Sequence, residues 1–579
     1  MAQSAEQAKK YHVTKDFKGV NTKANRTAIS ADEFSWLDNA MPIGFGNIKI
    51  INAKDTVANV AFSSGVVSLH SVSINLANVN SDLVVAMLDN GAAQYVNLTA
   101  GNTLGNIANA STFSNSGVQV TQWKNERVLF IDPVKGYKNW DGTNLTSVGS
   151  ILSVNITAGG SGYTSAPNVA ISATQETGGI NAAATATISN GAVTSITLTE
   201  SGTGYTDLPN VTVTITGGGG SNATATATGF SQVGQAIATF SGRVWISDNR
   251  TVYYSAADSF NDFGSISAGN IILVDSTLHG NITQLVSANN FLYVFGSDSI
   301  NVFSDVRVSA LTGETLFSNT NISASIGSNL KFAIFPYFRS ILFMNRYGMY
   351  ALVGSTTSKI SDSLDGVFPS IDFSYPVSGG QVLLNNILCA AFNFRTNYYS
   401  GTSRYVQAVF FEKKWFFTTQ DNALKFIVSS PVGGLINAYG TTGTNFVHLY
   451  ANTTADIAST VQTALMPMGD PIRDKQALKI GVEVTSTLGS LINATVDNEN
   501  RSSAPITLSS YVNWYNLNNQ TIPWTNNSSI AIAWINSGYF LYKSDAQQYG
   551  KYLGMTLTSN NAGFIYSGMN FEHELRARY

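Results

Sequence analysis

A short two-part phrase recurs along the chain and constrains its fold more than any other feature. A β-prone run follows a turn, and a second run rich in aromatic residues comes shortly afterwards. The clearest copies are "NERVLFID" with "GYKNWDG", "SGRVWISD" with "RTVYYSAAD", "NNFLYVFG" with "SINVFSD", and "FRSILFMN" with "GMYALVG". Weaker copies lie near Val84, Leu388 and Val447. Each copy predicts two neighbouring β-strands.

The centres of the first runs are evenly spaced. They are Val84, Val128, Val244, Leu292, Leu342 and Leu388, which gives spacings of 44, 116, 48, 50 and 46 residues. The long spacing contains an insertion over residues 151–230, and removing its 80 residues leaves 36. Propeller blades are four-stranded sheets that recur at roughly 40 to 50 residues. We therefore predict an all-β chain with a β-propeller of six to seven blades, the alternative being an irregular multi-sheet β protein.

The insertion carries a repeat of its own. "GGSGYTSAPNVAIS" is echoed by "ESGTGYTDLPNVTVT", so that Tyr163 aligns with Tyr205 and Pro167 with Pro209. Alternating Ala-Thr runs follow both copies, and such runs form strands with one small apolar face and one hydroxyl face. We predict a small two-repeat β module that is looped out of the propeller.

A second boundary lies near "ALMPMGDPIRDKQALKIGVEV", where proline and glycine interrupt the chain before a new alternating strand. Beyond it the two-part phrase is absent, and strands centred on Val484, Trp514, Trp524, Ile532, Leu541, Met555 and Phe571 predict a C-terminal β-sandwich. The expected organisation is a lead-in or docking segment (1–50), a first propeller segment (51–150), the inserted module (151–230), a second propeller segment (231–464) and the sandwich (465–579).

The composition favours a durable extracellular or assembled protein over a metabolic enzyme. Charged residues make up 12% of the chain, against about 25% in ordinary soluble domains. The surface must then be built from Ser, Thr, Asn and Gly. The one cysteine, Cys389, is expected to be buried and inert on a strand. No Sec-type signal and no membrane-spanning segment are visible, so we expect no stable membrane insertion.

Residue patterns for catalysis are scarce, and we expect no enzymatic activity, no cofactor and no metal. The five histidines show no metal-ligand spacing. In "FEHELRARY", Glu572 and Glu574 share one strand face and His573 takes the other, which favours a solvated or interface-facing strand. Aspartates at the expected blade turns suit turn formation, so a propeller hydrolase with paired carboxylates is a distant alternative. Near-balanced charges give no basic surface for tight DNA binding.

The stretch "SADEFSWLDNAMPIGFG" predicts a short helix before the propeller. Ser30 and Glu33 have capping-box spacing, and Trp36, Leu37 and Ala40 would share one apolar stripe. The stripe is too short to span a membrane. We expect these three residues to dock on the propeller or on a neighbouring subunit.

The N-terminal segment resembles that of tail β-propeller proteins of short-tailed bacteriophages, the nozzle or tail tubular protein B-like class. The matching elements are Gly19-Val20-Asn21-Thr22, Leu37-Asp38-Asn39-Ala40 and Gly44-Phe45-Gly46-Asn47. The ending "FLYKSDAQQYGKYLGMTLTS…GFIYSGMNFEHELRARY" and the blade phrases are similar as well. One departure is that "KIINAKD" stands where the family has an "R-P-G" phrase.

This resemblance implies a non-enzymatic structural protein of the virion tail, assembled in the host bacterial cytoplasm. It implies a homo-oligomer, a hexamer, that forms the distal DNA conduit, retains double-stranded DNA before infection and opens during ejection. The implied partners are a tail adaptor protein and tail fibres or spikes.

The leading alternative is a host-surface adhesin or receptor-binding tail protein. In that case Tyr163 and Tyr205 of the inserted module would act as aromatic platforms for a glycan. A role in packing the turns of the module is the other interpretation of these two residues.

Overall fold

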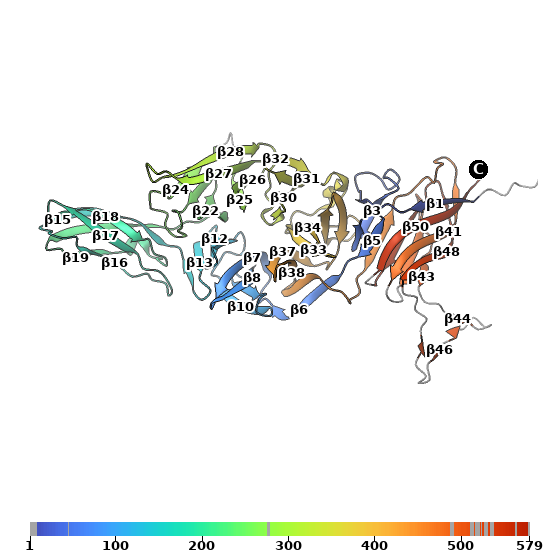
Figure 1. Ribbon diagram of the computed structural model, residues 1–579, viewed down its shortest axis with the longest axis horizontal. Coiled ribbons are helices and arrows are strands. Elements are labelled where there is room, and N and C mark those ends of the chain that lie inside the picture. Colours follow the sequence, from blue (N-terminus) through green and yellow to red (C-terminus); the bar gives the residue numbers. More distant parts are fainter. Residues whose placement is uncertain are drawn as a thin grey trace, which may run out of the picture.

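The chain folds into strands joined by turns and loops. The computed structural model describes residues 9–44, 46–274, 278, 280–486, 491–509, 514–515, 521–522, 524–525, 531–532, 538–561 and 564–576 (Figure 1). Within these residues the helical elements are short 3-10 turns, η1 (Leu208–Asn210), η2 (Lys331–Ala333), η3 (Asp362–Leu364) and η4 (Phe368–Ser370). The prediction of an all-β protein is confirmed.

Among the described residues, seven antiparallel blades of four strands form a β-propeller, which confirms the predicted architecture; six are separate sheets and the sixth blade is part of a ten-stranded sheet. Blade 1 contains β7 (Val66–Leu76), β8 (Val79–Leu88), β9 (Ala93–Asn97) and β10 (Thr103–Ala108). Blade 2 contains β11 (Gln119–Trp123), β12 (Arg127–Asp132), β13 (Gly136–Trp140) and β14 (Leu145–Ser147). Blade 3 contains β21 (Ala236–Phe240), β22 (Arg243–Asp248), β23 (Thr251–Tyr254) and β24 (Gly269–Ile272). Blade 4 contains β25 (Ile282–Ala288), β26 (Phe291–Gly296), β27 (Ile300–Val308) and β28 (Thr315–Ser323). Blade 5 contains β29 (Ile334–Tyr337), β30 (Ser340–Asn345), β31 (Gly348–Val353) and β32 (Thr356–Lys359).

The last of the seven blades includes a strand from the N-terminal region. Blade 6 contains β33 (Ser378–Leu384), β34 (Ile387–Thr396), β35 (Arg404–Phe411) and β36 (Lys414–Thr418). Blade 7 contains β37 (Leu424–Val432), β38 (Leu435–Thr442) and β39 (Asn445–Asn452), and its fourth strand is β6 (Ala53–Ala61) from the N-terminal region. The first strands of consecutive blades contact one another around the ring, and β37 contacts β7. Strand pairing between β39 and β6 therefore closes the ring, and closure protects strand edges.

The recurring phrase marks the turn between the first two strands of a blade. The residues at these turns with positive φ are Ala77, Asn78, Lys124, Ser241, Gly242, Asn289, Asn290, Phe338, Asn385, Asn386, Gly433 and Gly434. Two consecutive positive-φ residues match the right-handed twist of a β-hairpin, and Asn and Gly tolerate them best. The phrase near Val447 is an exception, because Val447 lies on β39, the third strand of blade 7.

A change at one of these turns gives a direct test of the backbone requirement. Asn386 is exposed and has a φ of 65°. Asn386→Val is expected to lower the free energy of unfolding by about 1–2 kcal/mol, because a β-branched residue is strained there. Asn386→Gly is the control and is expected to be neutral or stabilising. Chemical denaturation measures both; equal stability of the two variants would contradict the turn assignment.

The inserted module occupies the predicted position between blades 2 and 3. Its strands β15 (Ser150–Ser161) and β20 (Ser221–Phe230) pair with each other, and a four-stranded sheet combines β16 (Asn168–Ile171), β17 (Ala183–Ser189), β18 (Ala192–Glu200) and β19 (Val213–Thr216). The module projects from one end of the elongated molecule (Figure 1).

A β-sandwich lies at the opposite end, and it draws strands from both ends of the chain (Figure 1). One sheet contains β1 (Lys10–Thr14), β4 (Ala40–Ile43), β5 (Asn47–Ile50), β41 (Lys475–Ser486), β48 (Gly538–Gly550) and β50 (Phe564–Leu575). The other contains β2 (Gly19–Val20), β3 (Glu33–Asp38), β40 (Ser459–Thr463), β42 (Leu491–Asp497), β43 (Ile506–Ser509) and β49 (Gly554–Ser559), and it continues into blade 6 because β3 pairs with β36.

The prediction of a β-sandwich is therefore right, but the predicted range, 465–579, leaves out several of its strands. Segment 10–50 belongs to it rather than forming a separate lead-in, and β40 joins it before residue 465. Three predicted strand centres fall elsewhere, in two small hairpins formed by β44 (Trp514–Tyr515) with β45 (Thr521–Ile522) and by β46 (Trp524–Thr525) with β47 (Ala531–Ile532).

The predicted helix around Trp36 is wrong, because residues 33–38 and 40–43 are strands β3 and β4. One of the two capping-box contacts forms, since the Glu33 carboxylate accepts a hydrogen bond from the Ser30 N–H at 3.0 Å. The Glu33 N–H donates to the Ser30 backbone carbonyl at 3.0 Å rather than to the Ser30 hydroxyl. They close a turn, after which the chain extends and β3 pairs with β40.

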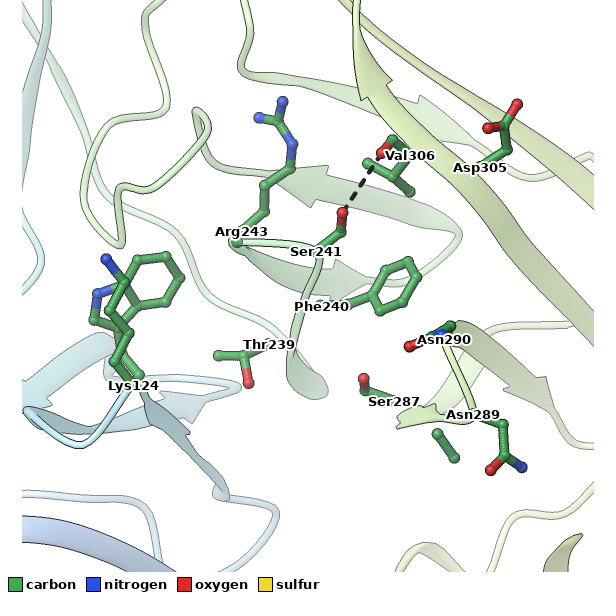
Figure 2. Close-up of a pocket in the computed structure, with 13 residues that line it drawn as sticks. Lys124, Thr239, Phe240, Ser241, Arg243, Ser287, Asn289, Asn290, Asp305 and Val306 are labelled. Atoms are coloured by element: carbon green, nitrogen blue, oxygen red, sulfur yellow. Dashed lines mark hydrogen bonds between the residues drawn. The ribbon is translucent and has the colours of Figure 1, made fainter. Parts of the chain in front are cut away.

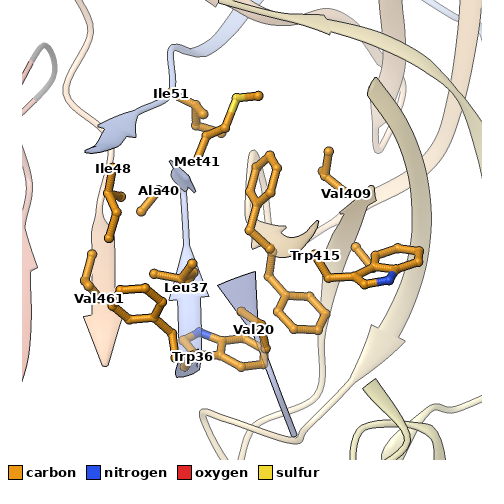
Figure 3. Close-up of a cluster of buried hydrophobic side chains, with 14 of the residues drawn as sticks. Val20, Trp36, Leu37, Ala40, Met41, Ile48, Ile51, Val409, Trp415 and Val461 are labelled. Carbon is orange, nitrogen blue, oxygen red and sulfur yellow. The ribbon is translucent and has the colours of Figure 1, made fainter. Parts of the chain in front are cut away.

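The expected docking residues are core residues. Trp36, Leu37 and Ala40 are at most 1% exposed (Figure 3). The Trp36 ring stacks on Phe417 of blade 6, with centroids 4.3 Å apart, and on Tyr399, 4.9 Å apart. Of the two expected docking partners, the propeller agrees with the structure, because Trp36 packs on blade 6. Docking of these buried residues on a neighbouring subunit is corrected: they join the sandwich to the propeller within one chain.

Candidate functional site

The first strands of all seven blades enclose a central cavity of about 610 Å³. Its walls carry amide and hydroxyl side chains together with aromatic and aliphatic ones. Among the described residues that line it, the titratable side chains are His70 and Lys331, and none is a carboxylate. Burial lowers the pKa of His70 to about 4, so its imidazole is neutral near pH 7.

Polar side chains cross this cavity from blade to blade. The Gln284 amide of blade 4 donates to Gln119 Oε1 of blade 2 at 3.2 Å. Lys331, just before blade 5, donates from Nζ to the carbonyl of Gln235, just before blade 3, at 2.9 Å. These side chains therefore span the central cavity at the end where the first strand of each blade begins.

A second hollow of about 710 Å³ lies at the first hairpins of blades 2, 3 and 4 (Figure 2). It shares Thr239 and Ser287 with the central cavity, so the two hollows adjoin. Its charged groups are engaged in the fold: Arg243 donates to the carbonyls of Ser255 at 2.7 Å and Ser267 at 2.8 Å, and Asp305 pairs with Arg307. These groups brace the propeller face.

The carboxylates predicted to serve turns behave as turn residues where their bonds are described. Asp132 is buried and accepts backbone N–H bonds from Val134 at 2.8 Å and Lys135 at 2.9 Å. Asp141 accepts from Thr143 at 2.9 Å and Asn144 at 2.7 Å. In the part of the chain that the structure describes, the residues lining the two hollows do not include the paired carboxylates of a glycosidase.

The described residues offer neither a metal cluster nor a reactive thiol. No group of three or more His, Cys, Asp or Glu side chains is arranged to hold a metal ion among them. Cys389 is fully buried on β34, and burial raises the pKa of its thiol to about 12. The predicted buried, unreactive cysteine is confirmed.

Tyr163 and Tyr205 are buried in the inserted module, at 5% and 1% exposure. Neither ring can offer a face to a glycan, so the platform hypothesis is corrected and the turn-packing interpretation holds. The Tyr205 hydroxyl accepts from the Ala182 N–H at 2.9 Å and donates to the Ser172 carbonyl at 3.1 Å. The Tyr163 hydroxyl accepts from the Ala223 N–H at a longer 3.4 Å.

The two equivalent tyrosines make a matched pair for mutation. Tyr205→Phe is expected to lower the stability of the module by about 1–3 kcal/mol, because it leaves the buried Ala182 N–H and the partly buried Ser172 carbonyl without their hydrogen-bond partner. Tyr163→Phe loses one long bond and is expected to cost less. Native-state hydrogen exchange of amides in β16–β19 measures both; a larger effect at Tyr163 would contradict this ranking.

Charged residues gather on the solvent side of the sandwich sheet formed by β1, β50, β41 and β48. In one row across these strands, Tyr11 lies beside Glu572, Glu572 beside Lys479, and Lys479 beside Asp545. The ion pairs on this side are Lys9–Glu572, Lys15–Glu483, Lys479–Asp545 and Arg576–Glu574. We call this surface, with the exposed Tyr11 and Val13, the outer face.

The strand "FEHELRARY" divides between the outer face and the core as its alternation predicts. Glu572 and Glu574 contribute to outer-face ion pairs, whereas His573 is 2% exposed between the sheets. The outer face as a whole was not evident from the sequence, because its members lie on strands from both ends of the chain. The visible signal was the alternation of charged residues in β41, β48 and β50.

Among the described residues, none of the helical elements is long and apolar enough to cross a bilayer. No protein-family model and no curated protein matches the chain.

Several solved structures align with it at low similarity. BBS1N in complex with ARL6DN is 6% identical, covers 69% of this chain and 98% of its own, and has a TM-score of 0.33. The N-terminal domain of Nup159 is 10% identical over 69% of this chain and 95% of its own, with a TM-score of 0.32. The Trypanosoma rangeli sialidase in complex with sialic acid is 8% identical over 99% and 96%, with a TM-score of 0.21. These neighbours are also β-propeller proteins.

Proposed function

We propose that this chain is a structural, non-enzymatic subunit of a short-tailed bacteriophage tail, a nozzle that forms the distal DNA conduit. The observation that carries the proposal is the outer face. Exposed ion pairs contribute only about 0–1 kcal/mol each to stability, so their concentration on one sheet face of a chain with 12% charged residues has little value for folding alone. Charge patterns across a contact set its register and its partner.

In this proposal the outer face meets a different surface on the next subunit. A contact of that kind closes a ring when its rotation matches the ring number, and the resemblance to nozzle proteins makes six the expected number. The ring would encircle double-stranded DNA on its axis, retain it before infection and release it during ejection. The tail adaptor would bind one end of the ring, and fibres or spikes would attach to its outer surface.

A charge-reversal variant on the outer face tests the assembly. Lys479→Glu places a carboxylate beside those of Asp545 and Glu572, and the cross-strand repulsion is expected to cost about 0.2–1 kcal/mol of stability per pair, too little to unfold the chain. We expect the unmodified protein, purified with its adaptor, to form rings in light scattering and electron microscopy, and Lys479→Glu to stay monomeric. Lys425→Glu makes the same charge change at an exposed propeller position and is the control. A wild-type protein that stays monomeric with its adaptor would overturn the proposal.

The inserted module supports a second candidate, a host-surface adhesin. It projects from the propeller at the end opposite the sandwich (Figure 1), and alternate positions of β20 are exposed. Deleting residues 151–230 separates the two functions. Lost adsorption by intact particles would favour the adhesin, and failed assembly or leakage of DNA would favour the nozzle.

A further inference from the structure

The central cavity contains a lysine for which the described residues supply no counter-ion. Lys331 lines the cavity, and within the described chain its Nζ has one hydrogen-bond partner, the carbonyl of Gln235, and no ion pair. Burial lowers the pKa of this lysine, which shows that the surroundings disfavour its charged form. A partly buried ammonium is stabilised by a bound anion, and the described residues that line the cavity include no carboxylate to supply one.

A hydrogen-bonding amide, that of Gln284, lines the same cavity as that lysine. The Lys331 side chain reaches from blade 5 to the start of blade 3, and Gln284 belongs to blade 4 between them. Gln284 Oε1 is buried and accepts no hydrogen bond from the described residues. A buried acceptor without a donor is costly, so a rotation of the Gln284 amide that brings this oxygen to the cavity surface lets it accept from a ligand hydroxyl.

An aromatic wall completes the site. Phe332 adjoins Lys331 in the chain and lies against the ring of Phe426, with centroids 6.1 Å apart, and against His70, 5.8 Å apart. All three side chains line the cavity. Apolar ring faces suit the C–H faces of a sugar, and pockets of roughly 300–1,000 Å³ hold small organic ligands.

We propose that the propeller cavity binds a small carboxylated sugar, with its carboxylate at Lys331, a hydroxyl donating to Gln284 Oε1 and its ring against Phe332. This binding does not depend on the proposed nozzle function. The ligand is either a free monosaccharide or the end of an acidic polysaccharide chain, and both present the same carboxylate and hydroxyl groups.

Calorimetric titration of the full chain with galacturonate, galactose and tetragalacturonate tests the site. We expect galacturonate to bind at least tenfold more tightly than neutral galactose, and Lys331→Met to abolish that preference while leaving galactose unchanged. Lys331→Arg is expected to retain the preference. The control is Lys138→Met, which removes another partly buried lysine whose pKa is lowered by burial, outside the cavity lining.

The outcomes distinguish a free monosaccharide from the end of a polysaccharide chain, and some of them would refute the proposed binding site. Tighter binding of tetragalacturonate than of galacturonate assigns the ligand to a polysaccharide end, and the reverse assigns it to a monosaccharide. Equal binding of galacturonate and galactose, absence of binding, or an unchanged preference in Lys331→Met would each overturn the proposal. If Lys331→Met fails to fold, Gln284→Met replaces it, with an expected loss of affinity for both monosaccharides.

Discussion

Trp36→Ala is expected to lower the free energy of unfolding by about 3–5 kcal/mol, the cost of emptying a large aromatic site in a core. The Trp36 ring is 1% exposed and stacks on Phe417 and Tyr399, at 4.3 and 4.9 Å. The substitution therefore leaves a cavity where β3 of the sandwich meets blade 6. We expect the sandwich to separate from the propeller at lower denaturant concentration, which tryptophan fluorescence and limited proteolysis will detect.

Tyr347→Ala is the matched control, because Tyr347 is 78% exposed. A change within about 0.5 kcal/mol is expected for an exposed side chain. A Trp36→Ala protein with unchanged stability that fails to assemble would revive the docking role that the structure argues against.

Arg404→Met is expected to destabilise the protein by about 3–5 kcal/mol, because it leaves a buried carboxylate without its cation. Asp38 is 6% exposed, and its Oδ2 accepts from Arg404 at 2.9 Å and from Thr419 Oγ1 at 3.0 Å. Burial raises the pKa of Asp38 despite the Arg404 guanidinium, whose charge acts in the opposite direction. Removing the guanidinium raises this pKa further.

The sign of the pH dependence follows from that shift. A carboxyl with a raised folded-state pKa supplies stability below its unfolded pKa and loses it as pH rises through the folded value. The deficit of Arg404→Met should therefore grow as pH rises from acidic to neutral, as measured by urea denaturation at several pH values. The double variant Asp38→Leu/Arg404→Met is expected to recover most of the loss, since replacing both partners of a buried pair is often neutral. A deficit that shrinks with rising pH would contradict this account.

The blades could be predicted because their second strands are buried on both faces. β12 and β22 are continuous apolar runs behind a tight turn, and this combination is visible in one sequence. The seventh blade was partly hidden because β6 belongs to the opposite end of the chain and reads "AKDTVANVA". Only strand pairing reveals that this segment completes blade 7.

The segment around Trp36 misled the helical prediction for a local reason. Asn39 has a φ of 54° and separates β3 from β4. Its side chain donates to the Ala458 carbonyl at 2.7 Å and accepts from the Thr419 N–H at 2.9 Å. β3 is covered on both faces, so Trp36 and Leu37 are both buried although they point to opposite sides of the sheet, and Ala40 is buried after the break at Asn39. A helix would also bury these three residues, so periodicity alone could not separate the two structures.

The cavity and the outer face could not be predicted from local patterns. Lys331, Gln284 and Gln119 lie on different blades or beside them, and each is an ordinary polar residue within its own segment. Their significance comes from ring closure, which places them around one space without a carboxylate among its described lining residues. The outer face similarly depends on β1 lying beside β50.

The pairing of the two chain ends has a consequence for synthesis on the ribosome. β6 cannot pair until its partner β39, which ends at Asn452, has been translated. β1 cannot pair until its partner β50, which ends at Leu575, has been translated. Such distant pairings form late, and the waiting strands keep unpaired edges until then. A chain released before β50 is translated lacks both the partner of β1 and the central strand of the outer face. Translation to the last strand is thus a condition for a subunit to present that surface at all.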